Sequence, residues 1–153
     1  MAKFRGTYES TLDDKGRFVF PKKLRQSLVP NTERFIIIPG HEQCLYLHPL
    51  DDWEKKEAEF GKLNEHNPEH RLLIRLLQDG LEEVALDNQF RIMLPAKHIE
   101  YAHLTLKSVI RVSGGFDKIE IWDPTMYKEY LNRPEYQRPY SDVSAAVLGG
   151  TSL

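Results

Sequence analysis

Short apolar runs, bounded by glycine, proline or polar turns, predict a chain built mainly of β-strands. Residues 7–12 alternate loosely between polar and apolar positions, and residues 17–20 are rich in aromatic and β-branched side chains. Residues 35–38 and 44–48 form two nearly continuous apolar runs, the first of them ended by Pro39-Gly40. We therefore expect strands at these four places.

Helices should separate the strands. Pro21 and Pro49 each suit the first position of a helix, where a proline loses no hydrogen bond, and the helix after Pro21 should run for about two turns over residues 22–28. A third helix should begin at Asn67-Pro68-Glu69 and end at Gly80. Its apolar residues lie around most of its circumference and are Leu72, Leu73, Ile74, Leu76 and Leu77. Such a helix has to be covered by its own domain, a twin domain or a neighbouring subunit.

The turn between the first two strands has a specific sequence. Asp14-Lys15-Gly16 suits a three-residue hairpin loop, in which a type I turn is followed by a glycine in the left-handed region. Asp13 and Arg17 lie on either side of this loop, close enough to form an ion pair across the hairpin. An exposed ion pair contributes only ~0–1 kcal/mol, so a structural role for this pair needs further support.

That support comes from a repeat of the motif. An acid, a base and a proline recur at an offset of 74 positions, as Asp13, Arg17 and Pro21 and then as Asp87, Arg91 and Pro95. At the same offset residues 109–112 match 35–38, Gly114 matches Gly40, residues 119–121 match 45–47, and Tyr127 matches Trp53. The offset predicts two copies of one β-rich unit of ~50 residues. The pairs Asp13–Arg17 and Asp87–Arg91 are then expected to be structural.

A unit of ~50 residues buries only a modest core by itself, so two copies are expected to complete a single barrel. We predict a mainly β fold with packed helices. The first repeat is placed at residues 1–53, a helical connector at 54–81, the second repeat at 82–127 and a C-terminal tail at 128–153. Within the tail, residues 141–148 favour a short helix at a subunit contact.

The overall composition is that of an ordinary soluble globular protein. The net charge is −2, so binding of nucleic acid would have to depend on how charge is distributed. Cys44 is the single cysteine, which excludes an internal disulfide and suits a reducing compartment. No apolar run approaches the ~20 residues that a membrane-spanning helix needs, and the first residues lack a signal-peptide core. A cytoplasmic protein is expected.

The repeated motif identifies a resemblance. The run from Leu12 to Pro21, its second copy, Glu100-Tyr101-Ala102 and Glu120-Ile121-Trp122 together resemble the MraZ family of bacterial transcriptional regulators, over about residues 3 to 131. The resemblance implies tandem AbrB-like (SpoVT-AbrB) domains that form a double-split β-barrel with swapped hairpins. It also implies a ring-shaped homo-oligomer, associated with the nucleoid. Such proteins bind short direct repeats in the promoter ahead of the division and cell-wall gene cluster, which includes their own gene.

The resemblance implies that the first copy contacts double-stranded DNA. Carried over to this chain, the contact residues are Arg17 and Lys15, with Lys22, Lys23 and Arg25 close by. The charge distribution agrees, because residues 3–25 hold seven bases against three acids, whereas residues 86–99 hold two bases against one acid. Phosphate contacts by lysine and arginine provide much of the affinity for nucleic acid, and arginine is the usual reader of guanine.

The second copy departs from the family pattern at two places. Phe90 occupies the position of Gly16, so either this loop changes type, or Phe90 adopts a strained positive φ, or a neighbouring subunit buries its ring. His98-Ile99 stands where the family usually has a leucine–arginine pair. The loss of that arginine favours a structural role for the second copy and argues against DNA contact by Arg91.

No catalytic constellation is evident. His66 and His70 are four residues apart, but Pro68 between them argues against a shared helical face and a zinc site. Cys44 has no adjacent base to activate it, and no phosphate-binding loop or nucleophile elbow occurs. We expect no cofactor, no metal and no enzymatic activity. The main alternative to DNA binding is an oligomeric scaffold that binds a protein partner through residues 72–77 and the tail.

Overall fold

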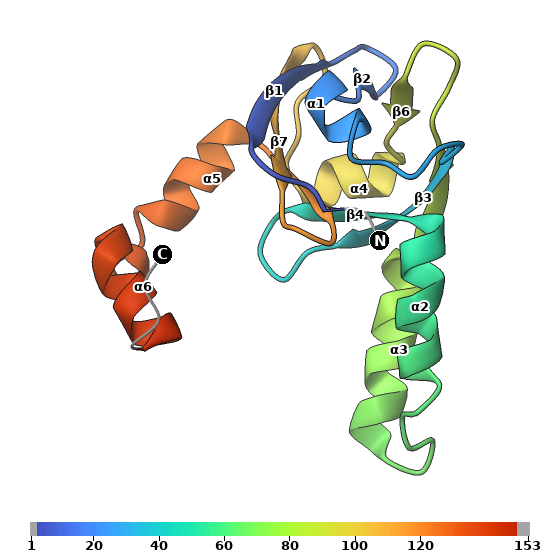
Figure 1. Cartoon of the computed structure of the whole chain (residues 1–153), viewed down its shortest axis with the longest axis vertical. Helices are drawn as coiled ribbons and strands as arrows, with labels where there is room; N and C mark the ends of the chain where they lie inside the picture. Colours follow the sequence, from blue (N-terminus) through green and yellow to red (C-terminus); the bar gives the residue numbers. More distant parts are fainter. Residues whose placement is uncertain (1–2, 150–153) are drawn as a thin grey trace.

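The computed structural model describes residues 3–149 and has mixed α and β content dominated by an antiparallel sheet (Figure 1). The strands are β1 (Thr7–Leu12), β2 (Arg17–Val19), β3 (Arg34–Pro39), β4 (Leu45–Pro49), β5 (Glu82–Ala85), β6 (Arg91–Met93), β7 (Ser108–Gly114) and β8 (Ile119–Trp122). The helices are α1 (Lys22–Arg25), α2 (Leu50–Phe60), α3 (Pro68–Gly80), α4 (Ala96–Tyr101), α5 (Pro124–Leu131), the 3₁₀ helix η1 (Pro134–Tyr136) and α6 (Tyr140–Leu148).

The strands form two antiparallel sheets. The larger has the order β1-β7-β8-β4-β3-β5, and the smaller is a two-stranded ribbon of β2 and β6. Within the described residues the larger sheet ends at β1 and β5, so its hydrogen bonds do not close into a barrel. The expected content of strands with packed helices is confirmed.

Each hairpin of the repeated motif divides its two strands between the two sheets. β1 pairs with β7 of the second repeat, whereas β2, which follows it, pairs with β6. In the same way β5 pairs with β3 of the first repeat. The two halves of the chain therefore exchange strands, and neither half forms its sheet alone.

The offset between the two halves is not constant, which corrects the match of residues 109–112 to 35–38. Phe35 pairs with Val84 in β5, and Ile110 pairs with Ser10 in β1. Ser10 and Val84 are equivalent positions of the two repeats, 74 residues apart (84 − 10). Their strand partners, Ile110 and Phe35, are therefore also equivalent to each other, but they lie 75 residues apart (110 − 35). One extra residue precedes β7, and it turns Ile110 into the core and leaves Val109 43% exposed.

The turn after this strand restores the original offset. The N–H of Gly40 donates to the carbonyl of Cys44, and the N–H of Gly115 donates to the carbonyl of Lys118. Gly115, not Gly114, is thus the counterpart of Gly40, whereas Cys44 and Lys118 are again 74 positions apart (118 − 44).

Two apolar clusters hold the elements together, one on each side of β3. Phe35 and Ile37 face the main core, which lies between the large sheet, the β2–β6 ribbon, α1 and α4. Ile36 and Ile38 face the opposite side, where they pack with Trp53 of α2. Both faces of β3 are covered, which explains its nearly continuous apolar sequence.

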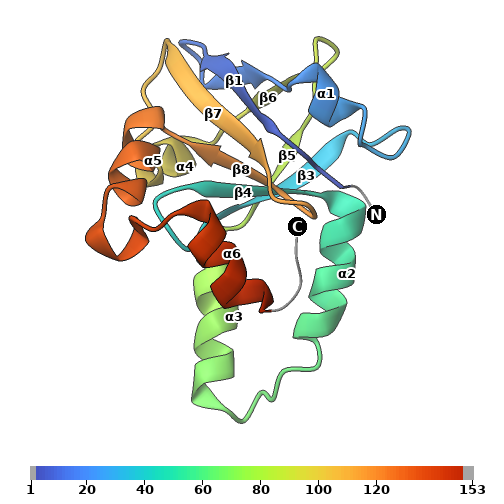
Figure 2. The ribbon, with the colours of Figure 1, turned by 60° about the vertical axis from the view of Figure 1, so that its left-hand side comes forward.

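The helices differ in detail from the sequence prediction. α1 has a single turn, Lys22–Arg25, instead of the two turns expected over residues 22–28, and its Leu24 is buried. α3 begins and ends where predicted, and the Asn67 side chain accepts a hydrogen bond from the N–H of Glu69 at 2.9 Å. α2 and α3 form a hairpin that extends away from the large sheet (Figures 1 and 2).

The C-terminal tail is helical. α6 begins at Tyr140, one residue before the predicted start, and follows α5 and η1 on the side of the molecule away from α2 and α3 in Figure 1. None of the helices between residues 3 and 149 is long and apolar enough to cross a membrane.

Candidate nucleic-acid interface

The β2–β6 ribbon presents an exposed outer face. Phe18 and Ile92 lie opposite each other at its centre and are buried against the main core. Because strand side chains alternate between faces, the residues on either side of them point outward. This outer face consists of Arg17, Val19, Arg91 and Met93, paired as Arg17 with Met93 and Val19 with Arg91. Each strand therefore contributes one arginine and one exposed apolar side chain.

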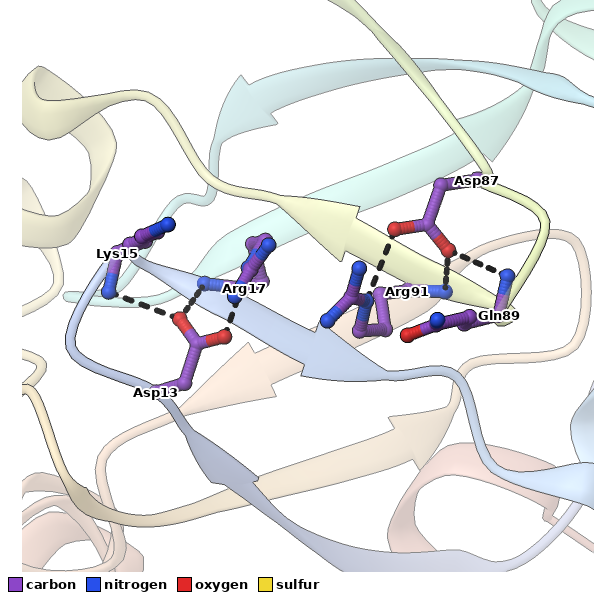
Figure 3. Close-up of polar contacts among 6 residues, drawn as sticks. All are labelled: Asp13, Lys15, Arg17, Asp87, Gln89 and Arg91. Atoms are coloured by element: carbon purple, nitrogen blue, oxygen red, sulfur yellow. Dashed lines mark hydrogen bonds and ion pairs between the residues drawn. The ribbon is translucent and has the colours of Figure 1, made fainter.

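Asp13 accepts hydrogen bonds from both the backbone and the side chain of Arg17 (Figure 3). Its Oδ1 accepts hydrogen bonds from the backbone N–H groups of Lys15 at 2.9 Å and Arg17 at 2.8 Å. Its Oδ2 accepts from the Nε of Arg17 at 2.7 Å. Within residues 3–149 these contacts engage only the Nε edge of the guanidinium, so its two terminal amino groups stay available for another acceptor.

The second hairpin has nearly the same geometry (Figure 3). Asp87 accepts from the N–H groups of Gln89 at 2.8 Å and Arg91 at 2.9 Å, and from the Nε of Arg91 at 2.9 Å. The side chains of Arg17 and Arg91 are 23% and 27% exposed. The ion pairs therefore do not distinguish the two arginines, and any difference in function has to come from the residues around them.

These contacts keep both acids ionised. The pKa of Asp13 is lowered to about 2, above all by the backbone N–H of Arg17; its guanidinium and the N–H of Lys15 add to this, while desolvation acts in the opposite direction. The pKa of Asp87 is lowered in the same way, with the backbone N–H of Arg91 as the largest cause. In both hairpins the backbone N–H of the arginine lowers the pKa of the acid more than any other single contact does. Neither carboxyl group suits general-acid chemistry.

The lowered pKa of Asp13 predicts an acid-dependent loss of stability. A carboxyl group with a depressed pKa in the folded state stabilises the fold above its unfolded pKa near 3.8, and this contribution disappears as the pH falls through about 2. The free energy of unfolding of the wild type should therefore decrease between about pH 4 and pH 2, and Asp13→Asn should show a smaller decrease. Urea denaturation over this pH range measures it. An identical pH dependence in the variant would contradict this role of the carboxylate.

Two turns bound the ribbon, and they have the same backbone conformation. Gly16 and Phe90 donate their N–H groups to Asp13 and Asp87, three residues earlier, and both have positive φ, 82° and 59°. The second loop therefore keeps its type, and Phe90 accepts the positive φ that glycine adopts in the first. The expected three-residue loop is confirmed at the first turn, and of the alternatives open for the second turn a positive φ at Phe90 is observed.

Strand exchange places each short helix over the turn of the other repeat. Arg25 of α1 stacks on the ring of Phe90, with 3.9 Å from the guanidinium carbon to the ring centroid. In the pseudo-equivalent position, Ile99 of α4 lies against Gly16. Phe90 is 49% exposed within the chain, and Arg25 covers part of its ring.

The predicted DNA-binding cations are thus divided between the two ends of the ribbon. Lys15 lies exposed on the first turn beside Arg17, whereas Arg25 lies at the second turn. Lys22 and Lys23 are exposed on α1. Sequence reasoning did not identify Val19 and Met93 as part of this face, although their alternation with buried Phe18 and Ile92 was a usable signal.

The equivalent lysine in the second repeat is already neutralised. Lys97 is the counterpart of Lys23 (97 − 23 = 74) and forms an ion pair with Glu82 at 2.9 Å. Lys23 has no ion pair with other residues in the part of the chain that the structure describes. His98, next to Lys97, is buried and donates from Nε2 to the carbonyl of Gly80 at 2.7 Å. Because α1 follows β2 and α4 follows β6, the free lysine of α1 lies at the end of the ribbon next to Arg91, and the paired lysine of α4 lies at the end next to Arg17.

Other reactive side chains do not assemble into a site. His70 accepts the backbone N–H of Asn64 at 2.9 Å through Nδ1, while His66 is exposed beside Glu65. Cys44 is buried, and burial raises the pKa of its thiol to about 12. Among the described residues, no group of three or more histidines, cysteines and acids is arranged to hold a metal ion.

Comparison with known proteins covers nearly the whole chain. The family described as "MraZ protein, putative antitoxin-like" matches residues 3–76 and 79–145. The chain is 37% identical over 132 residues to a protein named transcriptional regulator MraZ from Desulfitobacterium hafniense (strain Y51), an alignment that covers 86% of this chain and 89% of the relative. It is 38% identical over 127 residues to the protein of the same name from Clostridium acetobutylicum, covering 83% of this chain and 86% of that one.

Proposed function

Because the chain belongs to the MraZ family, we propose that it is a transcriptional regulator that binds double-stranded DNA through the outer face of the β2–β6 ribbon. The family is one of regulators and not of enzymes, in keeping with the names of the relatives. The observation that carries the proposal is Arg17, which Asp13 holds on the outer face of an exposed two-stranded ribbon. A ribbon of this width fits the major groove of B-form DNA.

Arg17 is the proposed base-reading residue. Asp13 fixes the guanidinium through Nε, so that the terminal amino groups can donate two parallel hydrogen bonds to O6 and N7 of a guanine. A fixed arginine loses less side-chain freedom on binding than a mobile one. Val19 and Met93, exposed beside it, are suited to contact the methyl groups of thymine.

The first repeat is proposed to dominate the contact. Lys15, Lys22 and Lys23 are exposed and suited to phosphate, with Arg25 stacked at the far end of the ribbon. The corresponding lysine of the second repeat, Lys97, is paired with Glu82. Phosphate contacts position the protein, and the ribbon reads the bases between them.

The larger assembly follows from the resemblance to the family. We propose a double-split β-barrel of two swapped-hairpin repeats at residues 1–53 and 82–127, with residues 54–81 as connector and 128–153 as tail. Copies of this unit form a ring and bind short direct repeats in the promoter of the division and cell-wall gene cluster, on the nucleoid in the cytoplasm. A single ribbon with few cations binds weakly, and repeated contacts strengthen binding through effective concentration.

The direct test is binding of the purified protein to a labelled fragment of that promoter, measured by fluorescence anisotropy. We expect tighter binding than to a scrambled duplex, with log K falling linearly against log salt concentration. Binding that is insensitive to salt, or equal for both duplexes, would contradict the proposal.

The lysines of α1 and α4 give a matched prediction. Lys23→Ala should reduce the slope of log K against log salt by about 0.9, because one phosphate contact is lost. Lys97→Ala, the equivalent change in the second repeat, should leave the slope unchanged, since that lysine is occupied by Glu82. Equal slopes for the two variants would contradict the assignment of phosphate contacts to α1.

A further inference from the structure

A half-exposed aromatic ring stands on the second turn of the ribbon, outside the core. Phe90 is 49% exposed and belongs to neither of the two apolar clusters formed by the described residues. Its φ of 59° is one that glycine adopts freely, as Gly16 does at the equivalent position, and that a bulky side chain adopts only at a cost. Neither burial nor backbone preference therefore explains why this position carries a ring.

The ring supports the guanidinium of Arg25, the last residue of α1. The guanidinium carbon lies 3.9 Å from the ring centroid, well within the ~6 Å over which the face of an aromatic ring attracts a cation. The turn itself is fixed, because the carbonyl of Phe90 accepts the N–H of Phe20 at 2.8 Å. The stack therefore restricts the orientations that the Arg25 side chain can adopt.

The charge of Arg25 has no counter-charge within residues 3–149. No carboxylate forms an ion pair with it, and its Nε is buried without a hydrogen-bond partner. Arg17 differs, because Asp13 accepts from its Nε and offsets part of its charge. A cation that is held by an apolar ring and is not neutralised suits an anion from outside the chain.

We propose that Phe90 is a positioning residue for DNA binding, whose ring holds Arg25 in place to bind a phosphate group at the second turn of the ribbon. The inference rests on the proposed function and deepens it, because it gives the two ends of the ribbon different tasks. At the first turn Arg17 reads a base, and the helix residue over that turn is uncharged Ile99, which lies against Gly16. At the second turn Arg25 binds the backbone.

The ring acts by ordering Arg25 before DNA arrives. A mobile arginine loses side-chain freedom when it binds a phosphate, at a cost that weakens binding roughly 2- to 10-fold. Stacking removes this freedom in the free protein, so the phosphate contact forms with less loss. The ring carries no charge, and the salt dependence of binding is set by the cations that neutralise phosphates. Loss of the ring should therefore lower the affinity without changing the salt dependence.

Phe90→Gly tests this with little risk to the fold, because glycine adopts the positive φ at no steric cost. On a duplex with one site, fluorescence anisotropy should show binding roughly 2- to 10-fold weaker than that of the wild type, with an unchanged slope of log K against log salt. Phe90→Asn, which also tolerates a positive φ, should reproduce this loss, and Phe90→Tyr, which keeps the ring, should retain the wild-type affinity.

Phe116 provides the matched control. It also has a positive φ, 65°, and is 74% exposed, but it lies in the turn between β7 and β8 and not on the ribbon. Phe116→Gly should bind DNA as the wild type does. An equal loss of affinity in Phe116→Gly and Phe90→Gly would overturn the proposal, because the effect would then not depend on the ring at the ribbon.

A double-mutant cycle tests whether the ring acts through Arg25. Arg25→Ala should weaken binding and reduce the slope of log K against log salt by about 0.9, because one phosphate contact is lost. Adding Phe90→Gly to this variant should cause no further loss, since no guanidinium remains to be positioned. Wild-type affinity in Phe90→Gly, or the same loss from Phe90→Gly with and without Arg25, would overturn the proposal.

Comparison of two duplexes separates this inference from the proposed function. A phosphate contact carries no sequence information, so Phe90→Gly should lose the same factor on the promoter fragment and on a scrambled duplex. If the wild type bound both duplexes equally, base reading by Arg17 would fail, and a shared loss in Phe90→Gly would still support the positioning of Arg25. A loss confined to the promoter fragment would overturn the assignment of Arg25 to phosphate.

Discussion

Replacing Arg17 with alanine is expected to abolish binding to promoter DNA while leaving the assembly intact. Loss of a bidentate contact to guanine weakens each site by about 1–3 kcal/mol, or roughly 5- to 150-fold. When an assembly binds several sites at once, the fold loss of affinity at each site multiplies with that at the others. The variant should therefore give no shifted band in a gel-shift assay at concentrations that shift the wild type completely.

Arg91→Ala is the matched control, because its ion pair with Asp87 has nearly the same geometry as that of Arg17 with Asp13. This variant should bind DNA but unfold at a lower temperature, because the hairpin loses the contact between Asp87 and the guanidinium. We assign Arg91 to the structure of the hairpin because the second copy has His98-Ile99 where the family usually has a leucine–arginine pair. Equal loss of DNA binding in the two variants, with the fold unchanged, would refute this division between the repeats.

The largest effect on stability is expected at the centre of the ribbon. Phe18 is 1% exposed and packs in the main core beneath the outer face. Phe18→Ala should lower the free energy of unfolding by about 3–5 kcal/mol, because the cavity under β2 cannot be refilled without moving the strand. Urea denaturation with two independent probes measures the change.

The neighbouring residue provides the control for that prediction. Val19 follows Phe18 in β2 but lies on the outer face and is 51% exposed. Val19→Ala should change the free energy of unfolding by no more than about 0.5 kcal/mol. Comparable destabilisation by the two substitutions would mean that the ribbon is not oriented with Phe18 inward.

Local features of the fold could be predicted because they depend on neighbouring residues. The loop at Gly16 and the capped start of α3 at Asn67 both follow from local backbone and side-chain preferences. The position of β7 could not be predicted in the same way. Both faces of β3 are covered, so its sequence is apolar at every position from 35 to 38 and gives no sign of which residues face the main core. A one-residue error in the match reverses the two faces of a strand.

The candidate interface depends on contacts between distant parts of the chain. The repeat identified Asp13–Arg17 and Asp87–Arg91, and their ion pairs are present. The pairing of β2 with β6, which places both arginines on one face, joins residues more than 70 positions apart and has no local signal. The stacking of Arg25 on Phe90 likewise requires the exchange of strands between the repeats.

The central claim is that this chain recognises repeated sites in DNA through the first hairpin. The most direct measurement is a footprint of the purified protein on the promoter of its own gene, at low salt, with the wild type and Arg17→Ala. We predict protection of evenly spaced short repeats by the wild type and no protection by the variant. The absence of protection by the wild type at low salt, or unchanged protection by Arg17→Ala, would contradict the account.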